Sequence, residues 1–201
     1  LEWWDRALIT AYMASFGVIV SSIIGITVGS LCARNRLASK IILLVCDTFQ
    51  TFPSFIYLIP VIMLFGVTDT SILIAVIVYA TIPATRYTVE GLNSVPQDLQ
   101  DAGSMSGVSN MQRWLKIELP LAFPHIMLGL NQTVVFALFM VIIGAFVGSD
   151  DLGQFILKAL SDKQGIGNGL LLGLCVAFIG LAVDHLIQTW ATQRRKLLGI
   201  D

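Results

Sequence analysis

Charged residues are scarce in this sequence. Asp, Glu, Lys and Arg together make up only 12% of the 201 residues, whereas 56% are hydrophobic, and the mean hydropathy is +0.82. A soluble domain carries about 25% charged residues. The composition therefore excludes an ordinary soluble domain and indicates an integral membrane protein. The few basic residues are too scattered along the chain to indicate nucleic-acid binding.

Residue patterns that carry catalysis or bind metals are also missing. The sequence has no Gly-x-x-x-x-Gly-Lys-Ser/Thr phosphate loop, no His-Glu-x-x-His, no Cys-x-x-Cys and no nucleophile elbow. The three cysteines lie inside apolar runs and offer neither a disulfide framework nor metal-ligand spacing: Cys32, Cys46 and Cys175. We therefore expect no catalytic residue, no metal site and no cofactor bound by this chain. If ATP drives its activity, the ATPase must be another chain.

The apolar residues are gathered into five long runs, which predict an all-α integral membrane protein with a single transmembrane domain over residues 1–201. The first run has 26 residues, enough at about 1.5 Å per residue to cross about 30 Å of hydrocarbon with some tilt. Pro53 and Pro60 interrupt the second run, so we expect that span to be kinked or broken. The predicted spans are about 8–33, 41–66, 71–90, 121–147 and 169–190.

Two features near the N-terminus carry further expectations. The chain begins with Leu1 and no basic stretch with a cleavage site precedes the first span, so no signal peptide is visible, and we expect a truncated or trimmed N-terminus. Ser21, Gly25 and Gly29 are spaced four apart in the first span. Such a stripe of small residues lets another helix approach closely.

The longest polar interruption between the runs is the segment 94–120, called the coupling segment below. Ser94 and Gln97 have the spacing of a capping box for a first short helix. Gly107 interrupts the helical pattern, and Ser109 or Asn110 can cap a second short helix. Pro120 is predicted to end that second helix.

The coupling segment resembles a cytoplasmic segment of ABC importer permeases. That family has Glu-Ala-Ala, three residues, Gly, nine residues and Ile-x-Leu-Pro, and this chain keeps the spacing, with Asp in place of Glu and Gly in place of the second Ala. The resemblance implies a five-helix permease domain whose cytoplasmic coupling helices contact a separate ATPase subunit. The residues that it assigns to this contact are Asp101, Ala102, Gly103, Gly107, Ile117, Leu119 and Pro120.

Three further stretches are similar to permeases of the glycine betaine/proline (quaternary amine) type: 47–60, 129–133 and 152–154. This resemblance implies an ATP-driven importer of a compatible solute such as glycine betaine, proline betaine, choline or carnitine. It also implies a pair of permeases, with a homodimer expected, on two ATPase subunits that bind ATP and Mg²⁺, and an extracytoplasmic substrate-binding protein or domain. The expected location is the bacterial or archaeal cytoplasmic (inner) membrane, as a multi-pass protein in contact with lipid.

The distribution of basic residues predicts the orientation. If the turn between the first two spans is cytoplasmic, nine basic residues lie inside and three outside, which fits the positive-inside rule. The coupling segment and the C-terminus are then cytoplasmic. The inner group is Arg34, Arg36, Lys40, Arg86, Arg113, Lys116, Arg194, Arg195 and Lys196, and the outer group is Arg6, Lys158 and Lys163.

Aromatic and polar residues in the second and fourth spans are candidates for the translocation path. A quaternary ammonium cannot donate hydrogen bonds, but aromatic faces attract it by about 0.5–2 kcal/mol each. Aromatic rings in membrane helices also pack against neighbours or lipid, and polar groups bond between helices, so packing and passage stay open as alternatives. The candidates are Phe49, Phe52, Phe55, Tyr57, Asn131, Gln132 and Thr133.

Several alternatives follow from the same residues. Arg86 and Glu90 are four residues apart and can pair on one helix face. Asp47 and Asp184 lie within spans and are expected to form ion pairs near the cytoplasmic interface; the alternative role for these acids is an ion relay. A secondary transporter would use such an acid, but it does not need the spacing of the coupling segment. A permease for another small solute, such as the amino acid methionine, and a membrane scaffold or channel subunit are the remaining alternatives.

Overall fold

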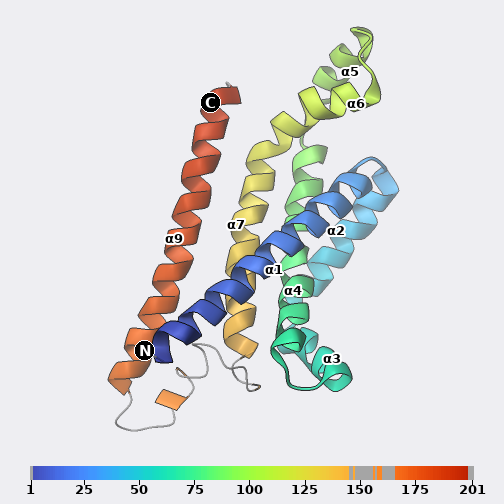
Figure 1. Ribbon diagram of the computed structural model, residues 1–201. Helices are drawn as coiled ribbons and strands as arrows, with labels where there is room; N and C mark the ends of the chain where they lie inside the picture. Colours follow the sequence, from blue (N-terminus) through green and yellow to red (C-terminus); the bar gives the residue numbers. More distant parts are fainter. Residues whose placement is uncertain (1, 145–146, 148–155, 157, 160–165, 199–201) are drawn as a thin grey trace.

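The chain folds into a bundle of long helices with a short helical hairpin at one end (Figure 1). The computed structural model describes residues 2–144, 147, 156, 158–159 and 166–198. The helices are α1 (Glu2–Ala33), α2 (Arg36–Thr51), α3 (Phe55–Phe65), α4 (Asp69–Asn93), α5 (Gln97–Met105), α6 (Asn110–Arg113), the π-helical turn η1 (Trp114–Glu118), α7 (Leu119–Gly144) and α9 (Ile166–Leu198).

Helix α4 forms the centre of the bundle. It packs against α1, α2, α3 and α7, and its buried side chains continue from Ile72 near its start to Leu92 near its end. A helix that is apolar on all sides is the kind that lies in the interior of a bundle. Ile72 and Val76 meet Met140 and Val141 of α7 in the main core, while α9 packs on the outer side of α7.

The stripe of small residues in α1 lies in close contact with α4. A Cβ atom added to Gly25 would lie 2.4 Å from Ala84 Cβ and 2.9 Å from the backbone nitrogen of Thr85. A Cβ atom added to Gly29 would lie 2.8 Å from Thr88 Cβ and 2.9 Å from the carbonyl oxygen of Thr85. The hydroxyl of Ser21 donates a hydrogen bond to the carbonyl of Ile77 (3.0 Å). The predicted close approach of a second helix is therefore confirmed, and its partner is α4.

The second apolar run is bent between α2 and α3. The two helices meet at 88° across a break of three residues. Phe52, which precedes Pro53, has an extended backbone (φ −74°, ψ 138°), the conformation that steric contact with the proline ring favours for the residue before it. Pro60 lies inside α3, which continues through it. The expected break therefore occurs at the first of the two prolines.

Four helices are long and apolar enough to cross a membrane, and the bent α2–α3 pair raises the number of candidate spans to five. The four are Ala7–Ala33, Asp69–Asn93, Asn110–Gly144 and Gly169–Trp190. The turn between α1 and α2, the α5–α6 hairpin and the C-terminal end of α9 lie at one end of the bundle, and the N-terminus and α3 lie at the other (Figure 1). The prediction of an all-α membrane fold is confirmed.

Candidate functional site

The coupling segment projects beyond the ends of α4 and α7 as a hairpin of α5 and α6 (Figure 1). Gly107 forms its elbow with φ = 75°, and a Cβ atom added there would meet nothing within 4 Å. Glycine is therefore favoured at this position by the positive φ angle and not by steric contact with neighbouring atoms. The Ser109 hydroxyl accepts from the backbone N–H of Gln112 (3.3 Å), and the Gln112 side chain accepts from the N–H of Ser109 (2.9 Å). Of the two predicted caps, Ser109 is the one used.

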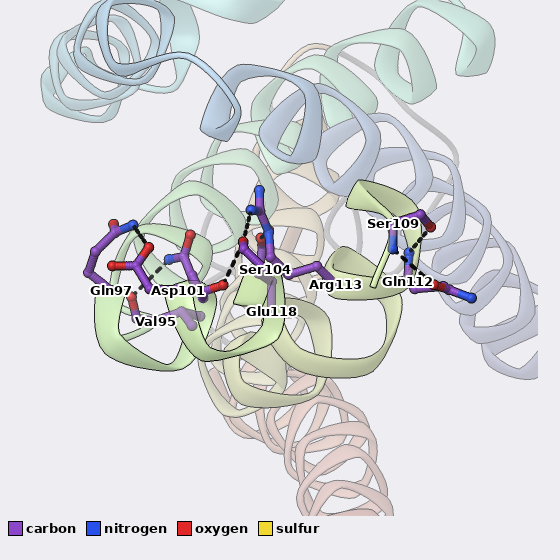
Figure 2. Close-up of polar contacts among 9 residues, drawn as sticks. Val95, Gln97, Asp101, Ser104, Ser109, Gln112, Arg113 and Glu118 are labelled. Atoms are coloured by element: carbon purple, nitrogen blue, oxygen red, sulfur yellow. Dashed lines mark hydrogen bonds and ion pairs between the residues drawn. The ribbon is translucent and has the colours of Figure 1, made fainter. Parts of the chain in front are cut away.

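Arg113 ties the two arms of the hairpin together. Its Nε donates to Glu118 Oε1 (2.9 Å) and its Nη1 to Ser104 Oγ on α5 (3.0 Å), as Figure 2 shows. The arms also meet through side-chain packing, since a Cβ atom on Gly103 would lie 2.6 Å from Ile117 Cδ1. The hairpin is therefore a connected unit and not two independent turns.

The other residues assigned to the ATPase contact fall on two sides of this unit. Asp101 and Ala102 are exposed on α5, where Asp101 accepts a hydrogen bond from Gln97 Nε2 (3.1 Å; Figure 2). Leu119 packs on a small core under the hairpin that includes Leu92 and Ala122. Asp101 and Ala102 are thus available to a partner, while Leu119 anchors the segment to the bundle.

Two local predictions for this segment are wrong. Pro120 does not end the second helix, because α6, η1 and α7 run on without interruption from Asn110 to Gly144. In the π-helical turn the N–H of Leu119 bonds to the carbonyl of Trp114, five residues back. The helix then continues through Pro120, as helices of this chain also continue through Pro60, Pro83 and Pro124. The Ser94 hydroxyl donates to the Gly91 carbonyl (2.8 Å) instead of capping α5.

Exposed apolar side chains are unusually frequent on this polar hairpin. Met105 is 90% exposed and Met111 57%, and Leu99 and Leu115 are also exposed. A cluster of exposed apolar side chains on a protein surface indicates a contact with another molecule. Methionine is well suited to such a surface because its side chain is flexible.

Rings from four helices form a continuous aromatic row at the α2–α3 break. Along this row the ring centroids are 5.6 Å apart for Phe52 and Phe49, 6.1 Å for Phe49 and Tyr57, 5.0 Å for Tyr57 and Tyr79, and 4.8 Å for Tyr79 and Phe136. The Tyr57 hydroxyl donates to the Phe49 carbonyl and thereby holds α3 against α2. The row runs from half-exposed rings on α2 to buried rings on α3 and α4.

The remaining path candidates lie on α3 and α7. Phe55 is 44% exposed at the start of α3. Thr133 is buried, and its hydroxyl donates to the Gly129 carbonyl (2.8 Å). Asn131 and Gln132 are half-buried on α7, and Gln132 lies one helical turn from Phe136 on the same face. The similar stretch 152–154 lies outside the described residues.

An ionic cluster joins α2 to α4 on the side of the break nearer the coupling segment. Arg86 Nε contacts Glu90 Oε1 (3.0 Å) and Asp47 Oδ1 (3.4 Å), and Arg86 Nη1 donates to Gln50 Oε1 (2.8 Å). The predicted pairing of Arg86 with Glu90 is confirmed. The contacts of Arg86 with Asp47 and Gln50 were not predicted, because nothing in the local spacing connects two different spans. Asp184 accepts from Gln188 on the same helix (2.9 Å).

These features together define a multi-span helical membrane protein with a structured hairpin at one end of the bundle. The chain matches the family of binding-protein-dependent transport system inner membrane components over residues 25–196, and it belongs to that family. The recognition of an ABC importer permease from the coupling segment is thereby confirmed, and with it the location in the inner membrane.

Individual relatives of the chain are also transport system permease proteins. The chain is 73% identical to the trimethylamine N-oxide transport system permease protein TmoV of Pelagibacter ubique, over 98% of this chain and 28% of that protein. It is 35% identical to the glycine betaine/proline betaine transport system permease protein ProW of Salmonella typhimurium, over 96% of this chain and 54% of that protein. The chain therefore spans only part of the length of these relatives.

The fold also matches a solved transporter. An inward-facing structure of the MetNI methionine ABC transporter aligns with a TM-score of 0.75, covering 98% of this chain and 95% of that chain, at 20% sequence identity. At this identity the likeness establishes the fold and says nothing of the solute.

Proposed function

We propose that this chain is the transmembrane subunit of an ATP-driven importer for a small compatible solute with a methylated amine, such as trimethylamine N-oxide, glycine betaine or proline betaine, with choline and carnitine as further candidates. The observation that carries the proposal is the hairpin of the coupling segment, which keeps the family spacing and offers exposed apolar and acidic side chains. The transport functions of the relatives, for trimethylamine N-oxide and for glycine betaine and proline betaine, support this class of solute.

The hairpin provides the surface to which a separate ATPase subunit binds. Asp101, Ala102 and the exposed methionines face the partner, and ATP and Mg²⁺ bind on that partner. Closure of two ATPase subunits moves two permease copies between inward- and outward-facing states. The two permease copies are identical chains that form a homodimer. A substrate-binding protein or domain delivers the solute on the opposite side. The nine-to-three division of basic residues supports a cytoplasmic coupling segment and C-terminus.

The aromatic row is the part of the chain best suited to pass such a solute. Aromatic ring faces attract a methylated ammonium without requiring hydrogen bonds, and each contact is weak enough to release it. Phe49 and Phe52 are the accessible members, at 41% and 37% exposed. Gln132 and the partly exposed Arg86 add donors near the row for an N-oxide or carboxylate oxygen. Asn131, Thr133 and Phe55 support the packing around it.

Reconstitution tests the class of transporter and its solute together. The full-length permease, its ATPase and its binding protein are placed in proteoliposomes, and ATP hydrolysis and uptake are measured with trimethylamine N-oxide, glycine betaine or methionine. The proposal expects hydrolysis and uptake stimulated by a methylated amine. Stimulation by methionine alone would refute the solute, and uptake driven by an ion gradient without ATP would refute the transporter class.

The aromatic row is tested with Phe49→Ala and the matched control Phe139→Ala. Phe139 is 51% exposed on α7 and contributes no ring to the row. Loss of one cation–π contact of about 0.5–2 kcal/mol at the barrier corresponds to about a 2- to 30-fold loss of uptake per folded transporter. Equal effects of the two substitutions, after correction for the amount of folded complex, would make Phe49 a packing residue.

A further inference from the structure

A cavity of about 1050 Å³ lies where the turn between α1 and α2 faces the coupling segment. Both structures stand at the same end of the bundle (Figure 1). The cavity is bordered by the ends of α1 and α4, the first turns of α2 and both arms of the hairpin, α5 and α6–η1. The side chains that define its charge are Arg34, Arg36, Lys40, Arg113 and Glu118, and the cavity is called the basic cavity below.

Positive charge in the basic cavity is largely uncompensated. Its only carboxylate among the described lining residues is Glu118, which is already paired with Arg113 at 2.9 Å. Arg34 lies over the ring of Trp114, with Cζ 5.9 Å from the ring centroid. Within the described ranges, neither Arg36 nor Lys40 has a carboxylate oxygen within 4.0 Å. Three like charges that converge on one concave surface favour binding of an anion.

The helix that supplies two of these cations also has an exposed apolar face. Leu37, Ile41 and Leu44 recur at helical spacing on α2 and are 67%, 54% and 68% exposed. This face is turned by about 100° from the face of Arg36 and Lys40, since consecutive helix residues are separated by that angle. A charged surface and an apolar surface therefore lie side by side on about the first two turns of α2.

From this arrangement we propose that the basic cavity binds the phosphate headgroup of an anionic phospholipid, whose acyl chains lie along Leu37, Ile41 and Leu44. Basic pockets between membrane helices at the interface recognise such headgroups. The apolar face distinguishes a lipid from a soluble phosphate, which has no chains to place there. The bound headgroup bridges the α1–α2 turn and the coupling segment. The site is additional to the proposed transport function and does not depend on which solute is carried.

Lipid binding to the full-length permease in detergent tests the site. The protein is titrated with dioleoyl phosphatidylglycerol or with dioleoyl phosphatidylcholine, which has the same chains and no net charge, and bound lipid is counted by native mass spectrometry. The variant is Lys40→Gln. The matched control is Lys116→Gln, because Lys116 is an exposed lysine of the coupling segment that does not line the cavity. Both lysines are exposed, so neither substitution is expected to prevent folding, and circular dichroism checks this.

The expected result is preferential binding of phosphatidylglycerol that Lys40→Gln weakens about fivefold, the change that corresponds to about 1 kcal/mol per cation. The double variant Arg36→Gln/Lys40→Gln weakens it about 30-fold on the same basis, and Lys116→Gln leaves it unchanged.

Four outcomes would overturn the proposal. The first is equal binding of the two lipids, and the second is an equal effect of Lys40→Gln and Lys116→Gln, which would indicate diffuse attraction. In the third, glycerol phosphate without chains competes as strongly as the lipid does, and the ligand is then a soluble phosphate. In the fourth, the purified ATPase subunit displaces all bound lipid, and the cavity then belongs to the interface with the ATPase. None of the four depends on solute uptake, so the proposal can fail while the transport function stands.

Discussion

Substitution of Gly107 separates a requirement for backbone angle from a requirement for space. Its φ of 75° lies in the left-handed region, while a Cβ atom there would touch nothing within 4 Å. The cost of Gly107→Ala is therefore the cost of that backbone conformation alone, about 1–2 kcal/mol. Such a cost reduces the native elbow relative to competing conformations by about 5- to 30-fold.

The same reasoning orders a series of substitutions at this position. Gly107→Val should be worse than Gly107→Ala, because a β-branched residue in this region is a strong outlier. Gly107→Asn should be the mildest, because asparagine visits the left-handed region readily. A bulky side chain by itself should do little harm, since the site is open to solvent.

Gly66 provides a matched control at the other end of the bundle. It has φ = 77°, and a Cβ atom added there likewise meets nothing within 4 Å. Gly66→Val imposes strain on the turn between α3 and α4, away from the coupling segment, because with ψ = 179° this position lies in a region essentially confined to glycine. We expect it to lower the amount of folded protein but to leave uptake per folded transporter unchanged. Gly107→Val should instead leave membrane abundance normal and abolish uptake.

The assay measures membrane abundance, co-purification of the ATPase and substrate-stimulated ATP hydrolysis for each variant. Uptake that survives Gly107→Val at normal abundance would show that the elbow does not transmit motion. Equal loss of hydrolysis in the Asn and Val variants would show that the added side chain, and not the strained backbone angle, disrupts the contact with the ATPase.

Two further predictions concern the helix contacts that hold the bundle. Gly25→Ala forces a Cβ atom against the backbone of α4 and should cost about 1–3 kcal/mol, seen as a lower unfolding temperature in detergent. Gly173→Ala on α9, which meets nothing within 4 Å, should not lower it, and equal losses would contradict this packing. Arg86→Ala leaves Asp47 and Glu90 without their cation and should lower the unfolding temperature by about 2–4 °C, for a partly exposed cluster worth about 1 kcal/mol. Arg86→Lys should recover most of this, and no loss in the Ala variant would show that the cluster does not contribute to stability.

Features set by neighbouring residues could be predicted from the sequence. The elbow at Gly107, the cap at Ser109 and the break at Pro53 depend on one backbone angle, one side-chain bond or one steric clash. The small-residue stripe around Gly25 predicted a close contact for the same reason. Its periodicity could not reveal that α4 is the partner.

Features that join distant segments could not be predicted in this way. Tyr79 and Phe136 complete the aromatic row from two other helices, and no spacing within the second span indicates them. Asp47 and Gln50 meet Arg86 across 36 to 39 positions of sequence. The basic cavity likewise forms only when the α1–α2 turn and the hairpin are brought to one end of the bundle.

The helix that continues through Pro120, against the prediction, joins the hairpin to the bundle. Arg113 and Glu118 are five residues apart, a separation that places side chains about 140° apart on a regular α-helix. The π-helical turn takes one extra residue into the turn and brings these two side chains to 2.9 Å. Pro120 lies within the continuous helix formed by α6, η1 and α7, and Arg113 also holds α5 through Ser104. The side-chain bonds of Arg113 and the continuous helix therefore connect α5 to the fourth span, and this connection is the route by which we propose that a force on the hairpin reaches the span.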